Sequence, residues 1–168
     1  MLAAASREPA TLVLGLDASA AVMAEASRRA AARARKGGMP NAHFALAAAE
    51  AIPPELAGLA RLVTVRFPWG SLLRGVVGDD DRAAAGVASL VAPRGVLELV
   101  LAPSDRDGLE AIPTSAAGLA DAAARAFAPF GFDVIEARAM SAVEVRATHS
   151  TWARRLNRLA VLIRLARR

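Results

Sequence analysis

Six short apolar segments alternate with stretches of helical periodicity along the chain. The apolar segments lie at 11–16, 42–47, 62–67, 96–101, 132–139 and 160–165. Runs of this length bounded by turn residues are typical of strands, and the first is expected to be buried on both faces, as in a parallel sheet. Helices are predicted at 20–36, at 79–90 and from Thr114 or Ser115 to Phe127, with a helix tail at 2–6 that Pro9 ends and a short helix or lid at 148–157.

Residues with capping chemistry mark the ends of these helices. The strand at 11–16 ends at Asp17, and Ser19 is placed to cap the helix that follows. Gly37-Gly38 ends that helix, because glycine readily takes the left-handed conformation found after a helix. The inner face of this helix is expected to carry four apolar residues, Val22, Met23, Ala26 and Ala30.

This alternation predicts an α/β protein with a doubly wound, mostly parallel sheet in a single domain over residues 1–168. Such folds usually open with a strand and a glycine-rich turn that closely approaches the ligand. No G-x-G pattern precedes Asp17. The first strand is therefore expected to be missing, and the chain to begin within what would be the first helix.

Composition narrows the possible chemistry. The net charge is +5, and of the 21 basic residues only Lys36 is a lysine. Arginine suits phosphate recognition and stacking on bases, although a GC-rich genome also favours it. The chain has no cysteine and only two histidines, without metal-ligand spacing, so a metal centre is not expected. With no apolar run of the ~18 residues that span a membrane and no signal-peptide pattern, a cytoplasmic protein is predicted.

Both tryptophans of the chain lie beside arginine. Trp69 follows the strand at 62–67 directly, in the turn Phe67-Pro68-Trp69-Gly70, and Arg74 comes shortly after. Trp152 lies in the segment 150–156, whose sequence is STWARRL. Ligands of α/β proteins bind at the carboxyl ends of the strands, so an aromatic ring placed there indicates a nucleobase site.

These residues resemble a known family. The segments LGLDA at 14–18, KGGMPNA at 36–42, AAEAIPP at 48–54, FPWGSLLRG at 67–75 and STWARRL at 150–156 are similar to those of the aminoglycoside-resistance 16S rRNA (adenine(1408)-N(1))-methyltransferases. The resemblance spans nearly the whole chain. It implies a Rossmann-like class I fold that uses S-adenosyl-L-methionine, acting on 16S rRNA in the 30S ribosomal subunit, as a monomer.

The resemblance also implies roles for individual residues. Trp69 and Trp152 would sandwich the target adenine, with Phe67 and Pro68 lining the pocket, although core packing is the ordinary alternative for an aromatic residue. Asp17 would bind the ribose of the cofactor, with a simple charge at the helix end as the alternative. Glu50 would lie over the cofactor adenine or help to organise the target pocket, with a solvated turn acid as the alternative. Ser71 would also contribute to the cofactor site. RNA contacts are expected from six basic residues: Arg154, Arg155, Arg158, Arg28, Arg29 and Lys36. The alternative is that these residues form charged surfaces that contact only solvent.

The proposed reaction needs little from side chains, since adenine N1 is already a nucleophile and transfer depends mainly on alignment. The missing glycine-rich turn is the main departure from the family. A chain of these residues alone is therefore expected to bind the cofactor poorly. Two alternatives remain open: a catalytically inactive RNA-binding remnant, and another Rossmann-like nucleotide-dependent enzyme.

Overall fold

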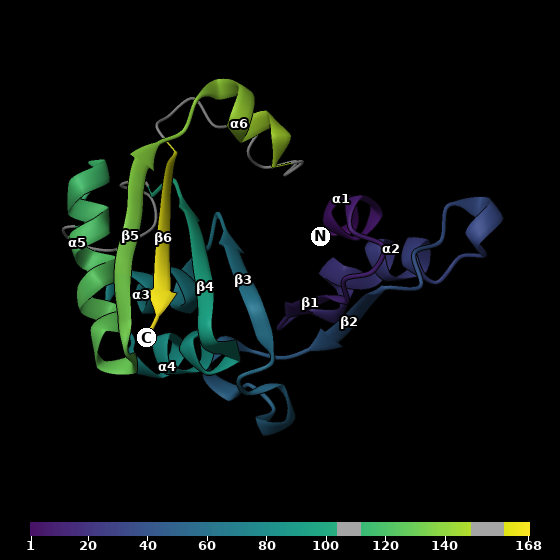
Figure 1. Ribbon diagram of the computed structural model, residues 1–168, viewed down its shortest axis with the longest axis horizontal. Helices are drawn as coiled ribbons and strands as arrows, with labels where there is room; N and C mark the ends of the chain where they lie inside the picture. The colour runs from purple at the N-terminus through teal and green to yellow at the C-terminus, as the bar shows by residue number, and fades with distance from the viewer. Residues whose placement is uncertain (104–111, 149–159) are drawn as a thin grey trace. The chain divides into compact units, whose positions relative to one another are not determined.

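The computed structural model describes residues 1–103, 112–148 and 160–168. Within these ranges the contacts divide the chain into two compact units, Met1–Ala48 and Ala49–Arg168. Figure 1 shows their elements, and each unit is described by itself. No helix in the described part of the chain is long and apolar enough to cross a membrane.

The amino-terminal unit is a two-stranded parallel sheet with short helices. It contains α1 (Leu2–Arg7), β1 (Val13–Asp17), α2 (Ala20–Ala30), the 3-10 helix η1 (Ala34–Lys36) and β2 (Ala42–Leu46). Val13 pairs with Ala42 and Asp17 with Leu46. The Asn41 amide nitrogen donates to the carbonyl oxygens of Ala5, Glu8 and Thr11 at 2.9–3.1 Å. One side chain thus ties the end of α1 and the approach to β1 to the start of β2.

Several predictions for this unit were wrong in detail. The strand at 11–16 is not buried on both faces, because Leu12 and Leu14 are exposed. The helix predicted over 20–36 ends at Ala30, and Val22, expected on its inner face, is 70% exposed. Ser19 occupies the N-cap position but makes no side-chain cap bond; its backbone N–H instead donates to Asp17 Oδ1 at 2.8 Å.

The carboxyl-terminal unit is built on a four-stranded sheet in the order β3-β4-β6-β5. The strands are β3 (Ala60–Arg66), β4 (Val91–Leu101), β5 (Phe132–Ala139) and β6 (Val161–Arg167). β3 and β4 are parallel, whereas β6 runs antiparallel to both β4 and β5. Hence β3, β4 and β5 point the same way, and their carboxyl ends meet at one edge of the sheet. The fold-class prediction of a mostly parallel α/β sheet is confirmed.

Three helices cover one face of this sheet: α3 (Gly70–Val77), α4 (Asp81–Leu90) and α5 (Ala116–Phe127). The core beneath them includes Leu73, Leu119 and Phe127 from helices and alternate strand residues such as Leu97 and Leu99. Because successive strand residues point to opposite faces, Glu98 between these leucines lies on the other face.

Side chains cap the beginnings of two of these helices. The Asp80 carboxylate accepts hydrogen bonds from the backbone N–H groups of Arg82 and Ala83, and Ser115 Oγ accepts one from Gly118. Short elements complete the unit: η2 (Ala49–Ala51), η3 (Pro54–Leu56), η5 (Ala128–Phe130) and α6 (Ala142–Ala147). Neither α3 nor α6 was predicted, and β4 begins five residues before the predicted start at 96.

Candidate functional site

The turn after β3 is built at the carboxyl edge of the sheet. The Phe67 backbone N–H donates to the Val100 carbonyl at 2.8 Å, which ties the start of the turn to the neighbouring strand β4. Phe67 has φ +50° and Gly70 has φ +60°. A left-handed φ costs glycine nothing but is strained for phenylalanine. Strain of this kind gathers at functional sites, so the turn is a strong site candidate.

Trp69 occupies the N-cap position of α3 with extended backbone angles. Its side chain is 81% exposed, whereas Phe67 and Pro68 beside it are half-buried. Aromatic side chains usually bury some 150–250 Å² of surface on folding, and a ring exposed to this extent loses most of the stabilisation that such burial gives. The core-packing alternative is therefore wrong for Trp69, and its ring is free to stack on a planar partner.

Glu50 and Ser71, both predicted to lie near the cofactor, come together in this unit. A hydrogen bond from the Ser71 side chain lowers the pKa of Glu50, and a bond with the Glu50 backbone adds to this effect. Glu50 lies in η2, and Ser71 lies in the first turn of α3, two residues after Trp69. The contact therefore places an ionised carboxylate next to the turn that carries the exposed indole.

Asp17 belongs to the amino-terminal unit and ends β1, as predicted. Its Oδ1 accepts the backbone N–H of Ser19 at 2.8 Å. A carboxylate can accept about four hydrogen bonds, so the contacts within the described residues leave most of its acceptor capacity unused. A carboxylate with this capacity fits a ribose diol, whose two hydroxyl groups can each donate a hydrogen bond.

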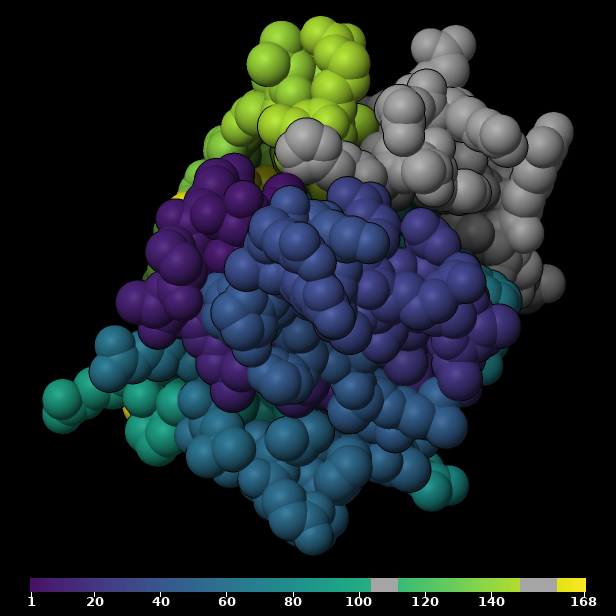
Figure 2. Space-filling model, turned by 90° about the vertical axis from the view of Figure 1, so that its right-hand side faces the viewer, coloured from purple at the N-terminus to yellow at the C-terminus, as the bar shows by residue number. Residues whose placement is uncertain are grey.

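The predicted RNA-binding residues of the amino-terminal unit are all on its surface. Arg28 and Arg29 in the last turn of α2 and Lys36 in η1 are exposed. These elements belong to the purple-to-blue surface that faces the viewer in Figure 2. Arg28 pairs with Glu25 at 2.9 Å, so part of its charge is already neutralised. Among the described residues, neither Arg29 nor Lys36 forms an ion pair, so the charge of these two is the more available of the three.

Trp152, Arg154, Arg155 and Arg158 lie outside the described residues, as does most of the predicted lid. The structure does show the elements that flank them, α6 and β6. The Met140 N–H donates to the Ala160 carbonyl at 2.8 Å, which closes the base of the connection between β5 and β6. That base lies at the carboxyl end of β5, hence at the same edge of the sheet as the Trp69 turn.

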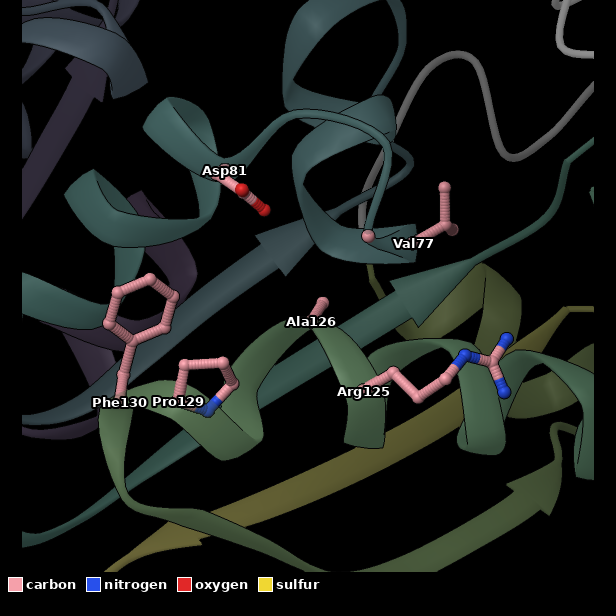
Figure 3. A pocket seen from close by; sticks show the side chains of 7 residues that line it. Val77, Asp81, Arg125, Ala126, Pro129 and Phe130 are labelled. Carbon is pink, nitrogen blue, oxygen red and sulfur yellow. The ribbon is translucent and has the colours of Figure 1, made fainter.

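A hollow of about 390 Å³ lies elsewhere on this unit (Figure 3). It is lined by Val77, Asp81, Arg125 and Phe130, among others, from the end of α3, the start of α4, the end of α5 and η5. None of the predicted site residues lines it. The Trp69 turn, with its strained backbone and exposed ring, is the better candidate on chemical grounds.

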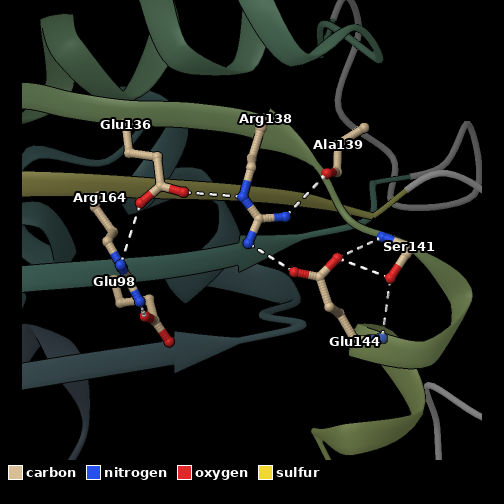
Figure 4. Close-up of polar contacts among 7 residues, drawn as sticks. All are labelled: Glu98, Glu136, Arg138, Ala139, Ser141, Glu144 and Arg164. Atoms are coloured by element: carbon tan, nitrogen blue, oxygen red, sulfur yellow. Dashed lines mark hydrogen bonds and ion pairs between the residues drawn. The ribbon is translucent and has the colours of Figure 1, made fainter.

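Sequence reasoning missed a group of charged residues on the face of the sheet opposite α3, α4 and α5. Figure 4 shows Glu98, Arg164, Glu136, Arg138 and Glu144 linked from β4 across β6 and β5 to α6. The pattern Ser141-x-x-Glu144 is a capping-box signature that could have predicted the start of α6. The pairing across strands had no such signal, because it depends on the register. In the described part of the chain, no group of three or more His, Cys, Asp or Glu side chains is arranged to hold a metal ion.

Comparison with known proteins gives one consistent result. The family model NpmA, 16S rRNA (adenine(1408)-N(1))-methyltransferase, matches residues 1–162. A 16S rRNA (adenine(1408)-N(1))-methyltransferase from Streptoalloteichus hindustanus is 36% identical over 159 residues, covering 91% of this chain and 73% of the relative. Its counterpart from Escherichia coli is 28% identical over 154 residues, covering 87% and 70%.

The solved structures that resemble this chain belong to the same family as the relatives found by sequence. The 16S rRNA methyltransferase KamB superposes with a TM-score of 0.87 at 29% identity, over 98% of this chain and 80% of that one. A tryptophan-to-alanine mutant of the enzyme from Catenulisporales acidiphilia, solved with the cosubstrate SAM, gives a TM-score of 0.82 at 31% identity, over 99% and 79%. The similarity therefore extends over both units of the chain.

Proposed function

The chain belongs to the 16S rRNA (adenine(1408)-N(1))-methyltransferase family, and on that basis we propose that it holds its target adenine at the Trp69 turn. The protein is an S-adenosyl-L-methionine-dependent enzyme that methylates N1 of adenine 1408 in 16S rRNA and so gives aminoglycoside resistance. A Rossmann-like enzyme of another class is thereby excluded.

The exposed indole of Trp69 carries this proposal. An enzyme that modifies a base inside an RNA helix has to extrude it, at a cost of a few kcal/mol. Stacking on one aromatic ring returns about 1–3 kcal/mol per base. Trp69 alone therefore offsets only part of the cost, and the predicted second ring, Trp152, would supply the rest. Phe67 and Pro68 shape the turn that presents the first ring.

The chain has to align the base rather than activate it. Adenine N1 is a neutral nucleophile with a lone pair in the ring plane, and S-adenosyl-L-methionine supplies an activated methyl group on a sulfonium. Holding the ring flat against Trp69 directs that lone pair along a fixed line, which is a proximity effect that needs no general base. The product carries a positive charge on the methylated base.

We propose that Asp17 holds the ribose of the cofactor through the acceptor capacity that Ser19 leaves free. In the carboxyl-terminal unit, Glu50 is kept ionised by Ser71 and is suited to accept hydrogen bonds from the amino or hydroxyl groups of a ligand. A carboxylate acceptor bonds hydroxyl and amino donors about twice as strongly as a neutral acceptor does. Both acids thus fit the polar groups of the cofactor.

We propose further that the substrate is the assembled 30S subunit and that the protein acts on it as a monomer in the cytoplasm, where ribosomes are found. Arg28, Arg29 and Lys36 would bind phosphates with salt-sensitive affinity, as would the second predicted group, Arg154, Arg155 and Arg158. Comparing methylation of 30S subunits with that of naked 16S rRNA tests the substrate. Light scattering of the purified protein tests the oligomeric state.

The central experiment is primer extension on 30S subunits incubated with the protein and S-adenosyl-L-methionine. A reverse-transcriptase stop at adenine 1408 is expected, since a methyl group on N1 blocks base pairing. Trp69→Leu keeps an apolar side chain but no ring and should weaken the stop strongly, whereas Trp69→Phe keeps a ring and should retain most of it. Equal stops from both variants would argue against stacking. Binding without a stop in any variant would instead indicate an inactive RNA-binding protein.

A further inference from the structure

The middle of α4 carries a glycine, Gly86, at a position where alanine would favour the helix more. The backbone of η2 occupies the space that a side chain would fill. A Cβ built on Gly86 would overlap the carbonyl oxygen of Ala49, and it would lie 2.9 Å from the carbonyl carbon of the same residue and 3.3 Å from Cγ1 of Ile52. Glycine alone therefore allows η2 to pack this closely on α4.

This packing decides where Glu50 lies. Glu50 directly follows Ala49 in η2, a 3-10 helix of three residues, none of them buried. Among the described elements, η2 packs chiefly against α4. The place where Ala49 meets Gly86 thus sets the distance from Glu50 to its partner Ser71 in α3.

The helix α4 is the fixed side of this contact. Asp80 caps its first turn, and the Arg167 guanidinium of β6 donates to the carbonyl oxygens of Ala88 and Val91 at its other end. Val87 and Ala88 are buried in the core of the unit. If a side chain were forced between the two elements, we therefore expect η2 rather than α4 to move.

A second glycine, Gly75, packs α3 against the same helix. A Cβ on Gly75 would lie 2.6 Å from the Cβ of Ala83 and 3.0 Å from the backbone nitrogen of Ala84. Ser71 precedes Gly75 by four residues, which places the two on the same side of α3. Both partners of the contact between Glu50 and Ser71 are thus carried by elements that pack on α4 through a glycine.

We propose that Gly86 and Gly75 are positioning residues for methyl transfer: the close packing that they permit places Glu50 beside Ser71 and the Trp69 turn. The inference rests on the proposed role of Glu50 as a hydrogen-bond acceptor for a ligand. Neither glycine has to touch the RNA or the cofactor. Accurate placement matters because a misplacement of about 1 Å can lower the rate of an enzyme about 100-fold.

Gly86→Ala tests the first contact. The new Cβ and the Ala49 oxygen have to separate to at least 3.0 Å, a shift of more than about 1 Å. This shift should break the hydrogen bond from Ser71, so the pKa of Glu50, measured by NMR titration, should rise toward its ordinary 4.5. We expect kcat/KM on 30S subunits to fall roughly tenfold to 100-fold.

Gly95→Ala is the matched control. A Cβ there would also be crowded, 2.8 Å from the carbonyl oxygen of Ala92 and 2.9 Å from Cγ1 of Val91. Gly95 lies near the start of β4, at the edge of the sheet opposite the Trp69 turn. Its replacement should lower stability but leave both the pKa of Glu50 and kcat/KM unchanged.

A double-mutant cycle separates positioning from a general loss of stability. If Gly86 acts through Glu50, Gly86→Ala should lower kcat/KM little further when Glu50→Gln is already present. Full additivity, an equal loss from Gly95→Ala, or an unchanged pKa of Glu50 in folded Gly86→Ala would overturn the proposal.

Gly75→Ala decides the question if circular dichroism shows Gly86→Ala to be unfolded. It opens the same contact from the side of α3, so the pKa of Glu50 should again rise. Adding Ala83→Gly removes the 2.6 Å contact and should reverse part of that rise. A pKa that stays constant in Gly75→Ala would refute the positioning role.

The failure of the proposed function has a different signature. The titration of Glu50 does not require methylation, so it reports on the packing even in an inactive protein. If the unmodified protein does not methylate 30S subunits, the proposed function is wrong. If Glu50→Gln retains the full kcat/KM, the role of Glu50 at the site is wrong, whatever the glycine variants show.

Discussion

Gly70 offers a direct test of whether the geometry of the Trp69 turn matters. It has φ +60°, and a Cβ added there would meet no atom within 4 Å. Gly70→Ala therefore introduces no clash, and its cost comes from the backbone alone. Gly131 has φ +80° and equally open surroundings, in the turn between η5 and β5, so Gly131→Ala is a matched control.

The left-handed conformation costs an alanine about 1–2 kcal/mol. In a protein of this size, that cost lowers Tm by roughly 2–8 °C, and it should do so in both variants. The consequences for activity should differ. In Gly70→Ala the strained residue directly follows Trp69, so we expect the backbone to adjust there in part and to move the indole. Loss of its stacking, worth about 1–3 kcal/mol, would lower kcat roughly fivefold to 150-fold.

The assay is single-turnover methylation of 30S subunits at a temperature where circular dichroism shows both variants fully folded. Gly131→Ala should retain the kcat of the unmodified protein. If the two variants lose stability equally and neither loses activity, the turn does not set the position of the ring, and its backbone strain has no role in catalysis.

Three further predictions concern the site residues. Ser71→Ala should raise the pKa of Glu50 toward its ordinary 4.5, measured by NMR titration. A lowered pKa gives its full stabilisation above the ordinary value and loses it as the pH falls through the lowered value, so the stability lost in the variant at pH 7 should begin to shrink below 4.5 and vanish below the pKa of Glu50 in the folded protein. Replacing Arg29 and Lys36 with alanine should reduce the slope of log K against log salt for 30S binding by roughly 0.7–0.9 for each phosphate that is no longer neutralised, and an unchanged slope would remove them from the interface. Asp17→Asn should weaken S-adenosyl-L-methionine binding in calorimetry at least roughly tenfold, since a charged acceptor contributes about 1.5–3 kcal/mol.

Local sequence patterns were enough to predict most of the carboxyl-terminal unit. The strand at 132–139 has the predicted bounds, and α5 ends at Phe127 with Ser115 as its cap. The helix α3 was missed because it is only eight residues long and begins at a glycine, which favours a turn. Predictions were poorest in the amino-terminal unit, where Leu14 of β1 and Val22 of α2 are exposed rather than buried.

The family, most of the strands and the turn residues Phe67 to Gly70 can all be recognised in the amino-acid sequence. These are local properties, carried by contiguous residues and by their periodicity. The exposure of Trp69, the contact of Ser71 with Glu50, and the link that Arg138 and Glu144 make between β5 and α6 emerge only in the folded chain. Such contacts depend on strand register and on the path of connecting segments, which bring together residues that no short pattern relates.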